Sequence, residues 1–321
     1  MRPFPSRSQL TICFAHSAYA MAATFARHTP DIHHFQVWTA AELDQRIPEA
    51  DVLVISGLWH NGLIPQAARL RYLQSISAGM DRYDGQALHG HGVYLASAAG
   101  VNSRAVAEHA LAHMLAFTRH IHTGRDNQQR RFWRDMIGNP VQREDELGGK
   151  TLLIVGYGRI GQRLAKLATA FDMRVLATKR NVSGVGGAEL YTPDHLPQLL
   201  PQADFIVLTC PLTPETEKLI NGPALSLMKK SAYLINVARG RVVDESALIA
   251  ALQNGTIAGA GLDCTWDEPL PADSPLWQME NVLLTPHTGG ETQQYEERVV
   301  AILLENLERL WRDERPLINQ V

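Results

Sequence analysis

A short glycine-rich segment that directly follows an apolar run constrains the fold of this chain more than any other feature. Residues 151–155 read Thr-Leu-Leu-Ile-Val, and Gly-Tyr-Gly-Arg-Ile-Gly occupies 156–161. A helical pattern then continues from Ile160 through Leu164 to Ala168. Strand, glycine turn and helix in this order predict a Rossmann unit, which binds a dinucleotide at the turn.

The three glycines of this turn have different tasks. Gly156 permits the tight turn, Gly158 lets the backbone approach a pyrophosphate, and Gly161 lets the helix pack closely on the strand. The helix N-terminus adds free N–H groups and a positive dipole end. Glycine-rich turns also occur as plain tight loops, but the flanking strand and helix favour a cofactor site. The predicted contacts of the turn are Gly156, Gly158, Arg159, Ile160 and Gly161.

The next predicted strand ends in Thr178, Lys179 and Arg180. A site for NAD usually places an Asp or Glu about 20 residues after the turn, where it binds the ribose hydroxyls. Lys179 occupies that place. Two cations and a hydroxyl suit the 2′-phosphate of NADP, which an arginine can bind with paired hydrogen bonds. Solvated charges at a strand end are the alternative interpretation, so the pattern favours NADP and leaves NAD open.

Three further segments follow predicted strands of the same region, where ligands bind in open α/β sheets: NVARG at 236–240, DCTWDEP at 263–269 and TPHTGG at 285–290. Reduction of a 2-oxo acid needs a cation for the substrate carboxylate and carbonyl, and Arg239 fits. It needs an acid for the new alkoxide, and His287 fits. Glu268 fits as the carboxylate that orients the imidazole and raises its pKa. Each residue alone is more often structural, but their joint occurrence at three strand ends favours catalysis.

Short apolar runs alternate with helical patterns along the whole chain. The runs show no polar alternation, which is typical of parallel strands buried on both faces. We predict strands at 10–15, 52–55, 72–75, 93–95, 151–155, 174–177, 205–208, 232–236, 259–262 and 282–285. Long helical patterns at 103–123 and 291–313 are predicted to cross between two domains, and the polar segment 125–149 is predicted to be a surface excursion. The fold class is therefore α/β, with a dinucleotide-binding domain at 103–289 and a discontinuous substrate domain at 1–102 and 290–321.

The ordered set of motifs resembles the D-isomer-specific 2-hydroxyacid dehydrogenase family over most of the chain. The motifs are SAGMD at 77–81, VNSRAVAEH at 101–109, GYGRIG at 156–161, CPLTPET at 210–216, NVARG at 236–240, LDCTWDEP at 262–269 and TPHTGG at 285–290. The resemblance implies two Rossmann-like doubly wound parallel-sheet domains with an active-site cleft between them, and a homodimer. It implies that Arg239, Glu268 and His287 form the catalytic group.

The resemblance also implies binding roles. Backbone N–H groups at Ala78 and Gly79, together with Arg239, would bind the substrate carboxylate, and Asp263 would bind the nicotinamide amide. Further cofactor contacts are expected at Cys210, Pro211, Thr216, Val237, Ala238, His287 and Gly289. Cys264 stands where the family usually has a valine, and Thr178-Lys179-Arg180 replaces the acidic signature of many members. Specificity for the substrate side chain is expected in the small domain and its loops, near Trp59, Met80, Tyr83 and an aromatic residue of the partner subunit.

The composition limits the partners. The chain has 321 residues, 20% of them charged, and a formal net charge of -3, so it lacks the basic excess typical of proteins that bind nucleic acid or anionic membranes. Its three cysteines, Cys13, Cys210 and Cys264, have no metal spacing, which favours reduced thiols in a cytoplasmic protein and no metal site. The N-terminal segment is interrupted by polar residues and predicts neither a signal peptide nor a membrane span.

Several functions share these motifs. The leading hypothesis is reduction of a small 2-oxo acid such as glyoxylate or hydroxypyruvate with NADPH or NADH. Formate dehydrogenase shares the scaffold but has glutamine beside the histidine, so Glu268 argues against it. Phosphite oxidation by a related branch stays open, as does a cofactor-sensing protein that resembles a transcriptional corepressor, although such proteins tend to carry long disordered extensions. The sequence leaves the substrate, the direction of the reaction and the pathway open.

Overall fold

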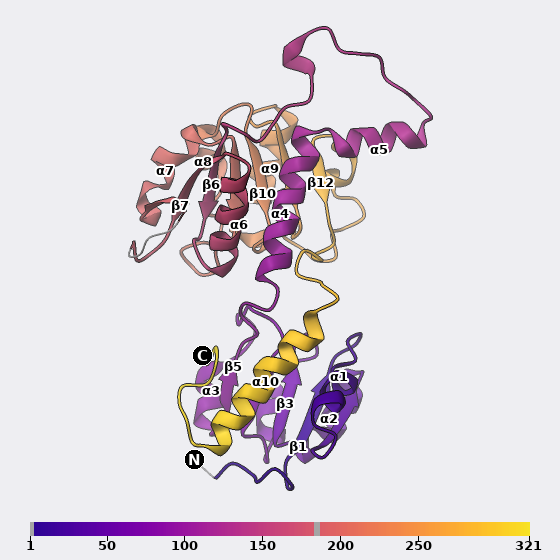
Figure 1. The fold of residues 1–321 in the computed structure, drawn as a ribbon, viewed down its shortest axis with the longest axis vertical. Coiled ribbons are helices and arrows are strands. Elements are labelled where there is room, and N and C mark those ends of the chain that lie inside the picture. The colour runs from indigo at the N-terminus through magenta and orange to yellow at the C-terminus, as the bar shows by residue number, and fades with distance from the viewer. Residues whose placement is uncertain (1–2, 183–186) are drawn as a thin grey trace. The chain divides into compact units, whose positions relative to one another are not determined.

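The computed structural model describes residues 3–182 and 187–321. The chain divides into unit 1, Met1–Asn102 with Thr292–Val321, and unit 2, Ser103–Glu291. The boundary expected between residues 289 and 290 lies two residues before the observed one. Figure 1 shows the two units, which are described separately below.

Unit 2 is built on a seven-stranded parallel sheet in the order β12-β11-β10-β9-β6-β7-β8. Strand β6 is the run before the glycine turn, and the chain moves outward from it in both directions. The strand order therefore reverses at the β6–β9 pair, the kind of position where doubly wound sheets bind their ligands. The strands are β6 (Thr151–Val155), β7 (Arg174–Thr178), β8 (Glu189–Tyr191), β9 (Phe205–Leu208), β10 (Tyr233–Asn236), β11 (Gly259–Leu262) and β12 (Val282–Leu284).

Helices cover both faces of this sheet. Because successive residues of a strand point to opposite faces, Leu152 and Ile154 pack into one apolar cluster and Leu153 and Val155 into another. The first cluster contains side chains of α4 and α6, and the second contains side chains of α7, α8 and α9. The helices of unit 2 are α4 (Ser103–Thr118), α5 (Ile121–Gln129), α6 (Arg159–Ala170), α7 (Leu196–Leu199), α8 (Gly222–Leu227) and α9 (Glu245–Gln253).

Unit 1 is a smaller doubly wound layer. Its five parallel strands have the order β2-β1-β3-β4-β5, the flavodoxin-like arrangement. Helices α1 and α10 share one apolar cluster with the sheet, and α2 and α3 share the other. The elements are β1 (Thr11–Ala15), α1 (Met21–His28), β2 (His33–Val37), α2 (Ala40–Arg46), β3 (Val52–Ile55), β4 (Tyr72–Ser75), α3 (Gly85–Gly90), β5 (Tyr94–Ala96) and α10 (Tyr295–Trp311).

All the predicted strands are present, with ends within one residue of those expected, but β2 and β8 were not predicted. Both are edge strands. β2 has the sequence His-His-Phe-Gln-Val with one fully buried residue, and β8 has Glu-Leu-Tyr with none. An edge strand is covered incompletely, so its sequence lacks the continuous apolar run that marks a central strand.

The two long helices differ from expectation. Neither crosses between the units, because α4 packs within unit 2 and α10 within unit 1. The pattern at 103–123 is also interrupted: α4 ends at Thr118, and α5 begins after His120, whose φ of 50° lies in the left-handed region. A left-handed residue breaks the helical path, so α5 leaves α4 in a new direction (Figure 1).

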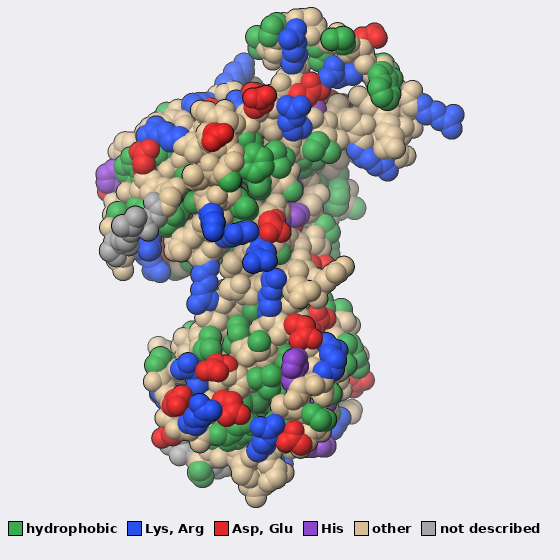
Figure 2. Space-filling model, viewed as in Figure 1, with side chains coloured by type: hydrophobic (Ala, Val, Ile, Leu, Met, Phe, Trp, Pro, Cys, Tyr) green, Lys and Arg blue, Asp and Glu red, His purple; other side chains and the backbone are tan. Residues whose placement is uncertain are grey.

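The chain from 121 to 144, which we call the arm, exposes large apolar side chains. The predicted surface excursion overlaps it. Trp133 is 95% exposed and Met136 98%. Phe132 and Val141 are exposed as well. Figure 2 shows hydrophobic and basic side chains gathered over this segment. Exposed apolar side chains that lie this close together are typical of an interaction surface.

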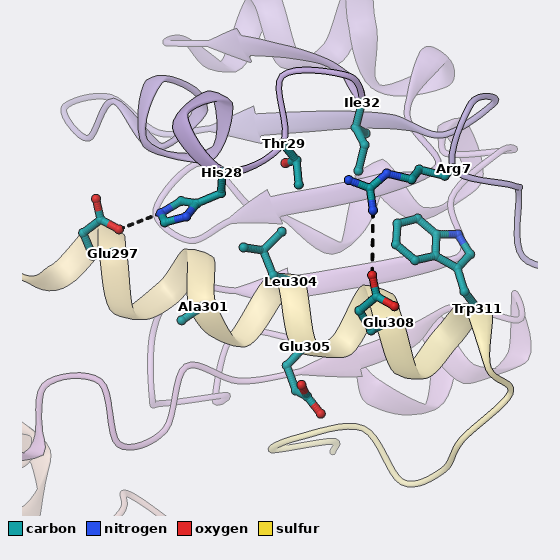
Figure 3. A pocket seen from close by; sticks show the side chains of 10 residues that line it. All are labelled: Arg7, His28, Thr29, Ile32, Glu297, Ala301, Leu304, Glu305, Glu308 and Trp311. Atoms are coloured by element: carbon teal, nitrogen blue, oxygen red, sulfur yellow. Dashed lines mark hydrogen bonds and ion pairs between the residues drawn. The ribbon is translucent and has the colours of Figure 1, made fainter.

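Within unit 1, helix α10 makes ion pairs along its polar edge in addition to packing through its apolar face. Figure 3 shows the hollow between α10 and the chain from Arg7 to Ile32, with Glu297 pointing toward His28 and Glu308 toward Arg7. The His28 Nε2–Glu297 Oε2 distance is 2.9 Å, and Arg7 Nη1 lies 3.8 Å from Glu308 Oε1. The charges of this hollow pair with one another, so we treat it as part of the helix packing.

Candidate active site

The glycine turn has the geometry expected of a dinucleotide site. Gly156 has φ of 102°, and a Cβ on it would lie 2.7 Å from the backbone of Cys210. A Cβ on Gly161 would lie 2.6 Å from the Gly156 carbonyl oxygen. Gly158 differs, because a Cβ there would meet no atom within 4 Å. The first two glycines thus fit tight packing, whereas Gly158 faces open space where a ligand can approach the backbone.

Helix α6 begins at Arg159, directly after Gly158, and no side chain caps it. The N-terminus of this helix, at Arg159 and Ile160, therefore presents its positive dipole end to an anion. The open backbone at Gly158 and this uncapped helix N-terminus fit the pyrophosphate of a dinucleotide.

The three residues after the second strand are placed differently from one another. Thr178 is only 3% exposed, and its Oγ1 accepts a hydrogen bond from the Gly156 N–H at 3.3 Å. It therefore supports the turn from inside the sheet. Lys179 is half-buried and Arg180 is exposed, both at the end of β7. Their role in binding a 2′-phosphate stays a prediction.

The loops after β9 and β10 are braced by their own side chains. Thr216 Oγ1 donates to the Pro211 carbonyl oxygen at 2.7 Å and accepts from the Thr213 N–H at 2.7 Å. Asn236, 1% exposed, donates to the Arg239 carbonyl oxygen at 2.9 Å and accepts from the Ala238 N–H at 3.0 Å. Asn236 stands in the NVARG motif but was not among the predicted site residues. The side chains of Cys210, Val237 and Ala238 are buried, so these residues can offer a ligand mainly their backbone.

The predicted catalytic residues come together at the carboxyl ends of β10, β11 and β12. His287 Nδ1 lies 2.8 Å from Glu268 Oε2 and 3.0 Å from Oε1. Since a carboxylate only accepts, the Nδ1–H donates and Nε2 is left as the nitrogen that can exchange a proton with a substrate. Arg239 is close enough for its charge to lower the pKa of His287 and of Glu268.

The charges of this group set the protonation of His287. The hydrogen bond to Glu268 raises the pKa of His287, and it outweighs the opposing effects of burial and Arg239. Burial is the largest single effect on the pKa of Glu268 and raises it, but the hydrogen bond and charge of His287, the Thr265 N–H and the charge of Arg239 together outweigh burial, and the pKa falls below its ordinary value. Both shifts favour an imidazolium–carboxylate pair, in which His287 is an acid.

Asp263 holds the loop that carries His287. Its Oδ1 accepts from the Thr288 N–H at 3.0 Å and from Thr285 Oγ1 at 2.7 Å, and its Oδ2 accepts from the Gly289 N–H at 3.0 Å. Burial raises the pKa of Asp263, but these bonds and one from His109 outweigh it and keep the carboxyl ionised. Asp263 is 4% exposed, and both of its carboxylate oxygens already accept hydrogen bonds. A contact with a nicotinamide amide, as the family resemblance implies, would be an additional hydrogen bond to this carboxylate.

Residues of unit 1 that were expected near the substrate have mixed surroundings. Ala78 is exposed and Gly79 half-buried, in the loop after β4. Trp59 and Tyr83 stack at 5.7 Å between ring centroids and are buried, and the Tyr83 hydroxyl donates to the Ile55 carbonyl oxygen. These two rings belong to the core of unit 1, and a role of this region in substrate specificity stays a prediction.

Within the described ranges, no group of three or more His, Cys, Asp and Glu side chains is arranged to hold a metal. The three cysteines are buried and form no disulfide. None of the helices in residues 3–182 and 187–321 is long and apolar enough to cross a bilayer.

Comparisons with known proteins identify the family of the chain. Residues 111–289 match the family model described as D-isomer specific 2-hydroxyacid dehydrogenase, NAD binding domain. The chain is 37% identical to a glyoxylate reductase of Pyrococcus furiosus over 87% of this chain and 85% of that protein. It is 39% identical to glyoxylate/hydroxypyruvate reductase B of Yersinia pestis over 83% and 82%. A solved D-isomer specific 2-hydroxyacid dehydrogenase of Xanthobacter autotrophicus, in complex with NADPH and MES, superposes with a TM-score of 0.81 at 26% identity over 98% of both chains.

Proposed function

Since this chain belongs to the D-isomer-specific 2-hydroxyacid dehydrogenase family, we propose that it reduces a small 2-oxo acid, such as glyoxylate or hydroxypyruvate, to the D-2-hydroxy acid. The observation that carries the proposal is the His287–Glu268 pair at the end of β12, with Arg239 nearby. The names of the two curated relatives support the substrate class.

The roles of the side chains follow from their charges. The bound nicotinamide supplies the hydride. Arg239 binds the substrate carboxylate and polarises the carbonyl, because its guanidinium offers paired donors to both groups. His287 gives the Nε2 proton to the oxygen on which negative charge develops. Glu268 holds the imidazole in place and stabilises its cationic form.

A panel of 2-oxo acids tests the function. Glyoxylate, hydroxypyruvate, pyruvate and a bulky 2-oxo acid are each assayed with NADPH and with NADH, and the product is analysed on a chiral column. We expect turnover that declines with the size of the side chain and a D product. If none of the acids is reduced with either cofactor, the proposed function is wrong.

Lys179 and Arg180 are proposed to favour NADP. Replacing both by alanine should raise KM for NADPH by about 10–100-fold, because a hydrogen bond to a charged group contributes about 1.5–3 kcal/mol, and should leave KM for NADH little changed. Steady-state kinetics with both cofactors measure this. Lys230→Ala is the matched control, because Lys230 is an exposed cation of the same unit. Equal changes with NADPH and NADH would contradict a phosphate contact.

The arm is proposed to join two copies of the chain. Trp133→Asp with Met136→Asp should convert a dimer to a monomer, because a charge in each buried patch is costly. Light scattering after size exclusion should give twice the chain mass of 35.6 kDa for the unmodified protein and the mass of one chain for the variant. Trp277→Asp, at an exposed tryptophan outside the arm, is the control. A monomeric unmodified protein would rule out this assembly.

A further inference from the structure

Two histidines of α4 lie beside the Asp263 carboxylate, which holds the loop that carries His287; we call this loop, residues 285–290, the catalytic loop. His109 and His113 are four residues apart, so they share a face of the helix. Their rings are 4.8 Å apart between centroids and nearly perpendicular. His113 is 5% exposed, and the His109 side chain is 23% exposed.

The hydrogen bonds fix which nitrogen carries a proton. The Thr285 hydroxyl donates to Asp263 Oδ1 at 2.7 Å, because a carboxylate only accepts, and this uses its one proton. His109 Nε2 lies 2.9 Å from Thr285 Oγ1 and must therefore be the donor of that bond. The same nitrogen lies 3.4 Å from Asp263 Oδ1.

His113 completes the set of acceptors around this proton. His113 Nε2 lies 3.2 Å from His109 Nε2. Since His109 Nε2 carries the hydrogen, His113 Nε2 accepts it. Burial and the neighbouring His109 lower the pKa of His113 to about 4, so His113 stays neutral at physiological pH with its hydrogen on Nδ1. The pair therefore has one defined arrangement of protons.

The surrounding backbone is shaped to admit both rings. A Cβ on Gly289 would lie 2.7 Å from Asp263 Oδ2 and 2.9 Å from His109 Cδ2. A Cβ on Gly261 would lie 2.7 Å from His113 Nδ1. Side chains are thus absent at the two points where the rings approach β11 and the catalytic loop, so both contacts depend on a residue without a Cβ.

The loop needs such support. His287 has φ of 55°, a left-handed conformation that costs a non-glycine residue about 1–3 kcal/mol and persists only where its surroundings hold it. The Thr288 and Gly289 N–H groups, next in the chain, bind Asp263. The conformation of His287 therefore depends on where the Asp263 carboxylate sits.

We propose that His109 and His113 are positioning residues that fix the Asp263 carboxylate, and through it the loop that presents His287 to Glu268. His109 donates to the Thr285–Asp263 pair, and His113 keeps the His109 ring from turning. The kinetic consequence rests on the proposed function, whereas the effect on the His287–Glu268 contact does not.

The test uses three variants of the full chain. His109→Leu removes the donor, His109→Gln retains an N–H donor at similar reach, and Thr285→Val removes the relay hydroxyl but retains its shape. His195→Leu, at an exposed histidine of unit 2 outside the network, is the control.

The first measurement is the titration of the His287 ring by NMR, which needs no substrate. The charged groups that face this ring are Glu268, Arg239 and Asp263. A loosened loop weakens the Glu268 contact, so His109→Leu and Thr285→Val should lower the pKa of His287 toward its ordinary value of about 6.5. His109→Gln and the control should retain the pKa of the unmodified protein.

The second measurement is kcat with the 2-oxo acid that the panel ranks highest. His109→Leu and Thr285→Val should each lower kcat by about 10²-fold, the effect of misplacing a catalytic group by about 1 Å, while KM for the acid changes less. His109→Gln should recover most of kcat. The double variant His109→Leu with Thr285→Val should have a kcat no lower than either single variant, because both substitutions remove the same hydrogen-bonded link to Asp263.

An unchanged His287 pKa in both His109→Leu and Thr285→Val would overturn the proposal, as would equal losses in His109→Leu and His109→Gln. If His109→Leu does not fold, Thr285→Val decides alone. If the protein reduces no 2-oxo acid yet the His287 pKa falls as expected, the proposed function is wrong and the positioning role stands.

Discussion

His287→Ala should lower kcat for 2-oxo acid reduction by about 10²–10⁴-fold, the usual contribution of a positioned general acid. The alanine removes the Nε2 proton that neutralises the developing alkoxide, while Arg239 and the glycine turn remain to bind substrate and cofactor. KM for both should therefore change much less than kcat. Steady-state kinetics of the purified variant measure both quantities.

The pH dependence provides an independent check on the same residue. Because Glu268 raises the pKa of His287, the proton donor persists above the ordinary value of about 6.5. Reduction should be fastest below the raised pKa and decline as pH rises through it, and oxidation of the hydroxy acid should show the opposite trend. Glu268→Gln removes the negative charge, so the declining limb of reduction should move to lower pH.

His195→Ala is the matched control, because this histidine of unit 2 is exposed and contacts its neighbours Tyr191, Thr192 and Asp194. It should leave kcat and the pH limb unchanged. If His287→Ala turned over every 2-oxo acid at the unmodified rate, His287 would not be the acid.

The central strands could be predicted because buried parallel strands leave continuous apolar runs. The juxtaposition of Arg239, Glu268 and His287 could be predicted because all three follow strand ends of one sheet. The edge strands β2 and β8 were not predicted, because an edge strand has one open side and can therefore carry polar residues. The helix break at His120 was not predicted either, because a histidine with a left-handed backbone does not change the pattern of apolar residues.

The supporting residues of the site were harder to predict than the catalytic ones. His109 and His113 lie at helical spacing on a largely apolar face, a pattern that also fits ordinary core histidines. Their partner Thr285 is distant by 176 positions from His109, and only the fold brings the two together. The support that Thr178 gives to the glycine turn was not predicted either, because it depends on the pairing of β7 with β6, which places its hydroxyl beside the Gly156 N–H.

Gly240→Ala is expected to lower both kcat and the free energy of unfolding, because the added Cβ would collide with the backbone of a neighbouring loop. A Cβ on Gly240 would lie 1.8 Å from the Thr265 carbonyl oxygen and 2.6 Å from the Trp266 nitrogen. Both neighbours are backbone, so no side-chain rotation relieves the contact and one of the two loops must move.

Each of these loops carries a residue of the proposed catalytic group. Arg239 directly precedes Gly240, and the Thr265 N–H donates to Glu268 Oε1 at 3.2 Å. Displacing either loop separates Arg239 from the Glu268–His287 pair, and a shift of about 1 Å can lower the rate about 10²-fold. The overpacking should also lower the free energy of unfolding by about 1–3 kcal/mol.

Kinetics and thermal unfolding of the same preparation separate the two effects of Gly240→Ala. Gly222→Ala is the matched control in unit 2, because a Cβ there would meet only Ala247 Cβ at 4.0 Å, and it should change neither kcat nor Tm. A Gly240→Ala protein with unmodified kcat and Tm would mean that the loops yield without cost. The observed approach would then be incidental, and the juxtaposition of Arg239 with Glu268 would not depend on a residue without a side chain.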